Sequence, residues 1–422
     1  VLPFLENKNI LVTGATGFLA KIFVEKILRV QPNILKIYLL LRAADDKSAS
    51  QRLQNEVTEK DLFRVLKENL GSNFNSFLTQ KIVLVVGDIS LGEDLGVKEP
   101  KLRQEMWSQL DVIVNLAATT NFDERYDVAL GTNTLGAKHV VCFAKKCAGL
   151  IPEAPYTFKD TLNGVSGLDI DEEKLIVQKK LNEFKTEEAT DESITEAMKD
   201  LGLKRLVHNC RTVDGFTLAY AKGRLKFFFV NAKGVVDVIP ADMVVNGMLV
   251  AMAAHATQPS LSIYHIGSSK RNPITYSEFR DYNFTYFKRR PWIGRNGEPV
   301  KVGRRMKMLG STSIFHTYMF FRYSLKLKAI AFTNSAFGKN SHSKYGDLKR
   351  KVNFMMRLMK LYKPYLFFSG IFDDQNTGKL QMAARKNSEE EAHLFYFDPQ
   401  AIDWEDYFLN AHFPGVVKNI RK

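Results

Sequence analysis

Residues 8–20 read Lys-Asn-Ile-Leu-Val-Thr-Gly-Ala-Thr-Gly-Phe-Leu-Ala, an apolar strand that runs into a glycine turn and then into a helix predicted over 18–29. Gly14 permits a tight turn off the strand, Gly17 lets a phosphate approach the backbone, and the small Ala20 allows close packing of the helix on the sheet. The N-terminus of such a helix directs free N–H groups and a positive dipole end at the phosphates. The stretch therefore predicts a dinucleotide-binding turn, and a glycine-rich turn without a ligand is the alternative.

The second predicted strand, Ile37–Leu41, ends at Arg42. An enzyme that uses NAD usually carries an Asp or Glu at this point, which binds the ribose hydroxyls. An arginine instead suits the 2′-phosphate of NADP through two charge-assisted hydrogen bonds, and Lys21 in the preceding helix could add to the contact. We therefore predict NADPH as the cofactor; the alternative is a solvated arginine at a strand end.

Strands and helices alternate along the first 148 residues. Further apolar runs and helical patterns predict strands over 82–86 and 112–116, and helices over 48–70, 99–109 and 123–147. Strands at this spacing predict an α/β fold with a Rossmann-like, doubly wound parallel sheet. Ligands bind such a sheet at the carboxyl ends of its strands, where Gly14, Arg42, Asp88 and Asn115 fall.

After residue 148, the composition and the predicted secondary structure change several times along the chain. Residues 168–200 are acidic and helical in pattern, with 11 acidic and 5 basic residues in 169–200. Two apolar runs, 225–230 and 235–239, flank Asn-Ala-Lys-Gly and predict a β-hairpin. A buried helix is expected over 243–254, basic aromatic-rich sequence follows around 280–330, and a C-terminal helical region is expected over 344–366.

Charge is distributed unevenly over the 422 residues, whose formal net charge is +14. Residues 270–350 carry 18 Lys and Arg against 4 Asp and Glu, mixed with Phe and Tyr. Such a surface suits nucleic acid, an anionic membrane or a polyanion such as coenzyme A, or it is simply solvated. Because no nucleic-acid module signature accompanies it, we expect no nucleic acid, whereas a membrane surface, coenzyme A and a solvated face all stay open.

The three cysteines, Cys142, Cys147 and Cys210, show no metal-ligand spacing. We therefore expect a reducing compartment, no disulfide framework and no metal. No uninterrupted apolar run approaches the roughly 18–20 residues that cross a bilayer. No secretory or transit peptide is visible, although one could have been trimmed.

The motifs together resemble a known family, the plant alcohol-forming fatty acyl-coenzyme A reductases, which are extended short-chain dehydrogenase/reductases with a C-terminal male-sterility domain. The similarity covers nearly all of 1–147 and 211–422. It is carried by four stretches of the chain: 4–21, 115–126 (Asn-Leu-Ala-Ala-Thr-Thr-Asn-Phe-Asp-Glu-Arg-Tyr), 237–246 and 362–374. It implies an NADP-binding reductase domain over 1–267, interrupted near 148 and 210, a connecting region over 268–343 and a male-sterility domain over 344–422.

The resemblance implies two hydride transfers from NADPH, which convert a long-chain fatty acyl-CoA into an aldehyde and then a primary alcohol for wax or suberin-type lipids. We also expect a place at the cytoplasmic side of the endoplasmic reticulum and, from the basic charge, peripheral contact with an anionic membrane surface. The implied pyrophosphate site comprises Thr13, Gly14, Thr16, Gly17, Phe18 and Leu19, and Arg42 binds the 2′-phosphate. Flanking the adenine are Asp88 and Ile89, while Asn115, Ala117 and Ala118 line the nicotinamide side and Asn133 lies near the active site.

The catalytic residues of the resembled family are missing at their expected places. Such reductases use a tyrosine acid, a lysine four residues later on the same helix face, and a Ser or Thr on the fifth strand that binds the oxyanion. Here Ala148 runs directly into Gly149, and only Leu206–Cys210 stands where the Tyr-x-x-x-Lys helix belongs. The one Tyr-x-x-x-Lys, Tyr345 to Lys349, lies in the C-terminal region and is interpreted as a helix-surface pair.

We therefore predict no catalytic residue in this chain, and interpret His208, His255 and His265 as ordinary polar residues. The chain is either a reductase by family or a non-catalytic member, and the latter is a pseudoenzyme or a gene model that lacks exons. Without a fifth strand, the strand over 112–116 would form an exposed edge. Either Phe227–Val230 pairs beside it, or the edge stays open and the protein has low solubility with local disorder around 148–212.

Overall fold

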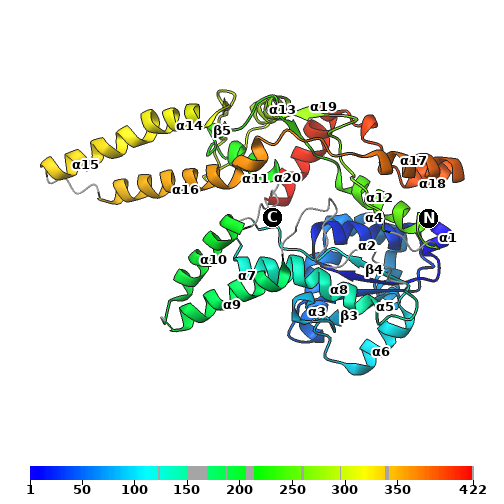
Figure 1. Cartoon of the computed structure of the whole chain (residues 1–422). Coiled ribbons are helices and arrows are strands. Elements are labelled where there is room, and N and C mark those ends of the chain that lie inside the picture. Colours follow the sequence, from blue (N-terminus) through cyan, green and yellow to red (C-terminus); the bar gives the residue numbers. More distant parts are fainter. Residues whose placement is uncertain are drawn as a thin grey trace. The chain divides into compact units, whose positions relative to one another are not determined.

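The computed structural model describes residues 1–121, 124–150, 169–186, 188–205, 213–257, 261–294, 296–337 and 342–420. The chain divides into two compact units (Figure 1). Unit 1 comprises residues 1–205, 239–266 and 374–397, and unit 2 comprises 206–238, 267–373 and 398–422. Each unit is therefore assembled from segments that lie far apart in the sequence.

Unit 1 contains a four-stranded parallel sheet in the order β3-β2-β1-β4. The strands are β1 (Asn9–Thr13), β2 (Lys36–Leu41), β3 (Ile82–Val86) and β4 (Val112–Asn115). Val12 pairs with Leu39 on one side and with Val114 on the other, which places β1 in the interior. All four strands lie where the sequence predicts them, and the Rossmann-like α/β fold class is confirmed.

The two faces of this sheet belong to different hydrophobic clusters, as alternation along a strand requires. Ile10 and Val12 face one cluster, together with Phe23, Val245 and Leu249. The intervening Leu11 faces the other cluster with Tyr38, Val85, Met106 and Phe143. The sheet is therefore covered by helices on both sides, which is the doubly wound arrangement.

The helices of unit 1 follow the predicted pattern with interruptions. The helix expected over 48–70 is broken into short pieces, and the one expected over 123–147 contains a π-helical segment, η5 (Leu130–Leu135). The helices are α1 (Leu2–Leu5), α2 (Phe18–Val30), α3 (Asp46–Leu53), η1 (Gln54–Thr58), η2 (Asp61–Phe63), α4 (Arg64–Leu70), η3 (Gly71–Asn73), α5 (Phe74–Lys81), η4 (Ile89–Leu91), α6 (Pro100–Gln109), α7 (Tyr126–Ala129), α8 (Gly136–Ala144), α9 (Ile170–Thr186), α10 (Asp191–Arg205), α12 (Ala241–Ala254), α17 (Gln375–Asn387) and α18 (Glu389–Leu394).

The acidic segment after the sheet is helical, as expected, and forms α9 and α10. The buried Glu173 carboxylate on α9 accepts a hydrogen bond of 2.6 Å from the Tyr126 hydroxyl on α7. Local disorder was expected around 148–212, and for the two stretches that form α9 and α10 that expectation is wrong. Residues 151–168 and 206–212, which include Cys210 and His208, lie outside the described residues.

The predicted hairpin over 225–239 is wrong. The turn itself forms, because the Gly234 N–H donates to the Asn231 carbonyl over 2.9 Å. The flanking strands nevertheless separate: β5 (Phe227–Phe229) pairs in parallel with β8 (Lys307–Leu309), and β6 (Val235–Val236) pairs with β7 (Ile274–Thr275). The reason is aromatic packing, since the Phe229 ring lies 5.0 Å from that of Phe315 and 4.6 Å from that of Phe367.

The pairing of β5 also excludes one of the two outcomes expected for the edge of the main sheet. Phe227–Val230 does not pair beside β4, so that outcome is wrong. Among the described residues, β4 is the last strand on its side of the sheet.

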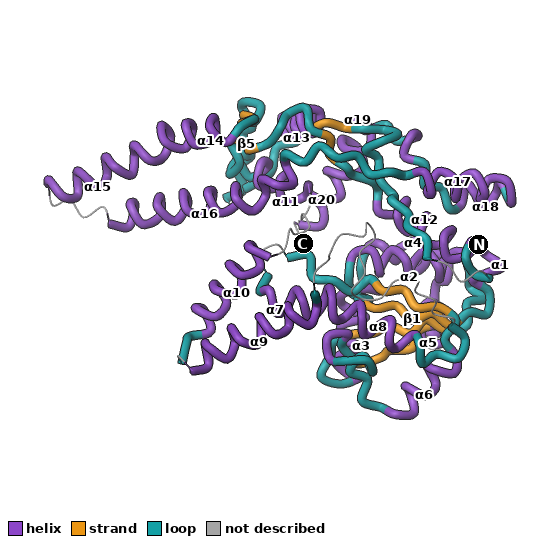
Figure 2. The backbone as a smooth tube through the Cα atoms, viewed as in Figure 1, coloured by secondary structure: helices purple, strands orange, loops and turns teal. Residues whose placement is uncertain are grey.

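Unit 2 is mainly helical (Figure 2). Its helices are α11 (Val213–Ala221), α13 (Tyr276–Arg289), α14 (Thr312–Met319), η6 (Phe320–Ser324), α15 (Leu325–Phe337), α16 (His342–Leu366), η7 (Pro399–Ala401), α19 (Trp404–Asp406), η8 (Tyr407–His412) and α20 (Phe413–Ile420). Helices α14 to α15 continue through η6 as one rod, and α16 returns alongside it, as Figures 1 and 2 show. We call α14, η6, α15 and α16 the arm.

Candidate functional site

The turn after β1 has the geometry that a dinucleotide-binding loop requires. Gly14 has a φ of +64°, which favours glycine, and a Cβ there would lie 2.7 Å from the Ala117 nitrogen. The Gly17 N–H donates to the Gly14 carbonyl over 2.7 Å, and a Cβ on Gly17 would lie 2.9 Å from the same oxygen. Both glycines are therefore required by the fold of the turn itself, before any ligand is considered.

The helix that begins after this turn can receive an anion. Gly17 is the N-cap residue of α2, and as a glycine it has no side chain to accept from the first N–H groups of the helix. Gly17 and Phe18 are exposed, while Thr16 and Leu19 are half-buried. The N-terminus of this 13-residue helix is therefore open to a phosphate, in line with the predicted pyrophosphate site.

Thr13 joins the ends of β1 and β4. Its buried hydroxyl accepts from the Leu116 and Ala117 N–H groups, each over 3.2 Å. The same hydroxyl donates to the Asn115 side-chain oxygen. Thr13 is thus a structural link between the two loops.

Arg42 lies exposed at the carboxyl end of β2, and a second arginine lies beside it. Arg52 on α3 donates to the Arg42 carbonyl, and its Nη2 lies 3.5 Å from the Thr16 hydroxyl. Glu56, one turn later, holds the guanidinium with contacts of 2.7 and 3.1 Å. Sequence reasoning missed Arg52; its spacing of four from Glu56 was the available signal.

Lys21, expected near the same phosphate, lies in the first turn of α2. Its ammonium donates to the Glu56 carbonyl over 3.3 Å. Burial, and secondly the charge of Lys60, lowers the pKa of Lys21, while Glu56 opposes this change. The Arg52 guanidinium and the Lys21 ammonium therefore both contact Glu56, and the Arg42 backbone lies beside Arg52 at this corner of the sheet.

Asp88 and Ile89, expected beside the adenine, follow β3. The Asp88 carboxylate accepts from the Ser90 N–H and from its hydroxyl, both over 2.8 Å. Ile89 is buried against Gly136, and its carbonyl lies 2.7 Å from the His139 ring nitrogen. These contacts stabilise the loop, and the role of the two residues toward adenine stays a prediction.

The predicted nicotinamide side lies at the end of β4. Asn115 and Ala118 are exposed there, and Ala117 is half-buried. Asn133, in the π-helical η5, holds the following loop: its amide donates to the Thr119 carbonyl over 3.0 Å and accepts from the Thr119 N–H over 2.8 Å. Asn133 thus supports the loop after β4, and its role near the active site stays a prediction. It lies in a π-helical segment, and such segments are frequent at functional sites.

The predicted non-catalytic residues are found in ordinary contacts. In α16, the Lys349 ammonium lies 6.0 Å from the centre of the Tyr345 ring, as expected of a helix-surface pair, and both belong to unit 2. The His255 ring shares a hydrogen bond of 2.5 Å with the Tyr264 hydroxyl. Cys142 and Cys147 are free thiols, and burial raises the pKa of Cys147 to about 11.

Neither a metal-binding cluster nor a membrane-spanning helix is found in the part of the chain that the structure describes. No group of three or more His, Cys, Asp or Glu side chains there could hold a metal ion. Within the same residues, no helix is both long and apolar enough to cross a membrane.

Two family models match the chain, both described as "Male sterility protein", over residues 12–200 and 322–422. An alcohol-forming fatty acyl-CoA reductase of Simmondsia chinensis is 47% identical, over 100% of this chain and 98% of the relative. Fatty acyl-CoA reductase 1 of Arabidopsis thaliana is 42% identical, over 100% of this chain and 99% of the relative.

The alignment with the Simmondsia relative also bears on the missing segments. It spans 488 positions, which is 66 more than the 422 residues of this chain. The relative therefore carries residues at 66 or more positions where this chain has none.

Among solved structures, the terminal R domain from the myxalamid PKS-NRPS biosynthetic pathway shares the fold. Its TM-score is 0.54 at 16% identity, over 98% of this chain and 91% of that domain. This likeness supports the α/β fold.

Proposed function

The chain belongs to the fatty acyl-CoA reductase family, and on that premise we propose that it binds NADPH and takes long-chain fatty acyl-CoA as its substrate class. When bound, NADPH supplies the hydride that reduces the acyl group. The relatives' names support the substrate class. The single observation that carries cofactor binding is the Gly14–Gly17 turn, which leads into the open N-terminus of α2.

The proposed contacts follow the strand ends. Thr13, Gly14, Thr16, Gly17, Phe18 and Leu19 would hold the pyrophosphate, Arg42 the 2′-phosphate, Asp88 and Ile89 the adenine, and Asn115, Ala117 and Ala118 the nicotinamide. We add Arg52 to the 2′-phosphate site, because its guanidinium lies between Thr16 and the Arg42 backbone. The proposed domain ranges remain 1–267, 268–343 and 344–422, although residues 374–397 pack with unit 1.

A second candidate function rests on the missing acid. Reduction to a primary alcohol requires a group that protonates the developing alkoxide. The tyrosine and lysine that the family resemblance implies are not present at their expected places in the sequence, and the alignment with the Simmondsia relative leaves 66 or more positions unmatched. The chain as written would then bind NADPH without turnover, either as a pseudoenzyme or as the product of a gene model without those exons.

We also propose that the protein works on the cytoplasmic side of the endoplasmic reticulum, in peripheral contact with an anionic membrane surface. The excess of Lys and Arg over residues 270–350 supports such contact, because anionic lipids attract basic segments. A long-chain acyl substrate, which partitions into membranes, is consistent with the same location.

Cofactor preference tests the proposed function directly. NADPH should bind at least about tenfold more tightly than NADH, since one charge-assisted contact contributes roughly 1.5–3 kcal/mol. Arg42→Asp and Arg52→Met should each reduce or abolish this preference, as measured by fluorescence titration. Arg64→Asp is the matched control, since Arg64 is exposed on α4 and pairs with Glu68. Equal affinity of the unmodified protein for both cofactors would refute the NADPH assignment.

A further inference from the structure

The rod of the arm lies within a long stretch without acidic residues. From Pro299 to Gly346 the sequence has nine Lys and Arg and no Asp or Glu. Arg322, Lys326 and Lys328 are exposed on the rod. Residues 299–346 therefore carry positive charge and no acidic residue that would neutralise it. A binding partner of this surface should be negatively charged.

The same rod exposes large apolar side chains. Phe321 is 66% exposed and Phe332 is 69% exposed, and Ile314, Phe320 and Leu325 are also exposed. Its buried face is separate: Phe315 and Met319 pack with Phe227 and Phe229 in a hydrophobic cluster of unit 2. The rod is thus anchored by one set of aromatic residues and presents a second set to the solvent.

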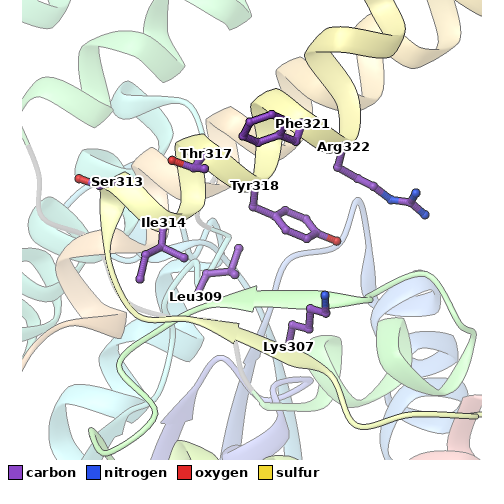
Figure 3. A pocket seen from close by; sticks show the side chains of 8 residues that line it. All are labelled: Lys307, Leu309, Ser313, Ile314, Thr317, Tyr318, Phe321 and Arg322. Carbon is purple, nitrogen blue, oxygen red and sulfur yellow. The ribbon is translucent and has the colours of Figure 1, made fainter.

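Basic and apolar groups are interleaved at short range on this surface. The Lys328 ammonium lies 5.6 Å from the centre of the Phe320 ring. An open hollow of about 590 Å³ lies between α14 and β8 (Figure 3). Leu309, Ile314 and Tyr318 line it, together with Lys307 on β8 and Arg322 on η6.

This combination matches the interface of an anionic bilayer. Aromatic and aliphatic side chains lie at the level of the lipid headgroups, while lysine and arginine stems extend their charges toward the lipid phosphates. An exposed apolar surface of this kind gains nothing from the phosphates of a nucleic acid, whose attraction is mainly electrostatic. A second copy of this chain would bring an equally basic surface, which repels.

We propose that the rod of the arm, residues 312–337, is the element through which this protein lies on an anionic membrane surface. Phe321 and Phe332 enter the headgroup region, and Arg322, Lys326 and Lys328 contact the lipid phosphates. This inference rests on the membrane contact proposed above and assigns it to particular residues.

Vesicle cosedimentation of the full chain tests the assignment. The vesicles contain phosphatidylcholine alone or with phosphatidylserine at about 30%, a fraction that gives a negative surface potential. Phe321→Ser/Phe332→Ser should weaken binding to anionic vesicles at least about tenfold, because two large apolar side chains are removed from the interface. Lys326→Glu/Lys328→Glu should weaken it by about thirtyfold or more and leave any binding to neutral vesicles unchanged.

Matched controls lie on unit 1. Leu175, which is 69% exposed on α9, and the exposed Met382 are changed together to serine, and Lys98→Glu/Lys101→Glu reverses two exposed charges. Both control variants should bind vesicles as the unmodified protein does. Circular dichroism and NADPH titration check that each variant is folded.

The outcomes distinguish a failure of the proposed membrane contact from a failure of its assignment to the arm. If the unmodified chain binds no anionic vesicles, the proposed membrane contact and this assignment both fail. If the arm and control variants lose vesicle binding equally, or if the arm variants lose none, the assignment to the arm is refuted, while the proposed membrane contact stands. Dimers that dissociate with Phe321→Ser/Phe332→Ser, or an RNA affinity above the vesicle affinity, would overturn the assignment in favour of another partner.

Discussion

The loops that follow β1 and β4 lie side by side at one edge of the sheet, yet they differ in what they offer a ligand. The loop after β1 leads into a helix N-terminus that no side chain caps. The loop after β4 directs its backbone groups inward, toward Thr13 and Asn133. The first loop is ready for a charged ligand, whereas the second is supported by the protein itself.

We expect this chain to retain cofactor binding and to lack the residues for turnover. Phosphate binding needs backbone N–H groups and nearby cations, and both are provided by residues 13–56. Hydride transfer needs, in addition, an acid that protonates the developing alkoxide. The family resemblance implies that a Tyr-x-x-x-Lys helix supplies this acid. In this sequence that helix is missing from its expected place after Lys204.

The largest expected difference is between turnover, which we expect to be lost, and cofactor binding, which we expect to be retained. The chain as written should form no fatty alcohol from long-chain acyl-CoA and NADPH above background, while it still binds NADPH. A general acid–base residue typically contributes about 10²–10⁴-fold, and here the oxyanion hydroxyl and the ribose lysine are lost as well. Gas chromatography of the products measures the alcohol.

The Simmondsia chinensis reductase serves as the positive control in that assay. Robust alcohol formation by the purified chain would show that another residue supplies the proton. The second candidate function would then be excluded.

Substitution at the contact between the two loops, where Gly14 lies against the Ala117 backbone, is expected to have the next largest effect on stability and cofactor affinity. Gly14→Ala should lower the free energy of unfolding by about 2–4 kcal/mol and weaken NADPH binding more than tenfold, because the added methyl group overlaps the Ala117 backbone and φ is positive. Thermal unfolding and cofactor titration measure the two effects. Gly378→Ala on α17 has no atom within 4 Å of the added methyl group, so it should leave NADPH binding unchanged and raise stability by about 0.5–1 kcal/mol, as Gly→Ala does inside a helix.

The support of the β4 loop is expected to give the smallest effect. Asn133→Ala removes two hydrogen bonds to Thr119 and should cost about 1–2 kcal/mol of stability, since each such bond contributes roughly 0.5–1.5 kcal/mol. Thr132→Ala in the same π-helical segment is the control. If cofactor affinity falls as far as it does with Gly14→Ala, the two loops are coupled more tightly than their separate hydrogen bonds indicate.

Much of unit 1 could be predicted from the sequence by itself. The four strands, the glycine turn and the helix after it follow from short-range rules: alternating burial along a strand, a positive φ that favours glycine, and an amphipathic helix. The position of Arg42 follows as well, because the residue after a parallel strand lies at the ligand-binding edge. These features need only neighbours in the sequence.

The tertiary structure decided what depends on distant partners. Phe227–Phe229 pairs with Lys307–Leu309, because the aromatic surface that covers it comes from helices far along the chain. Arg52 reaches Thr16 only through the packing of α3 beside the turn. Short strands and long side chains take the partner that buries or pairs them best, and local sequence does not identify that partner.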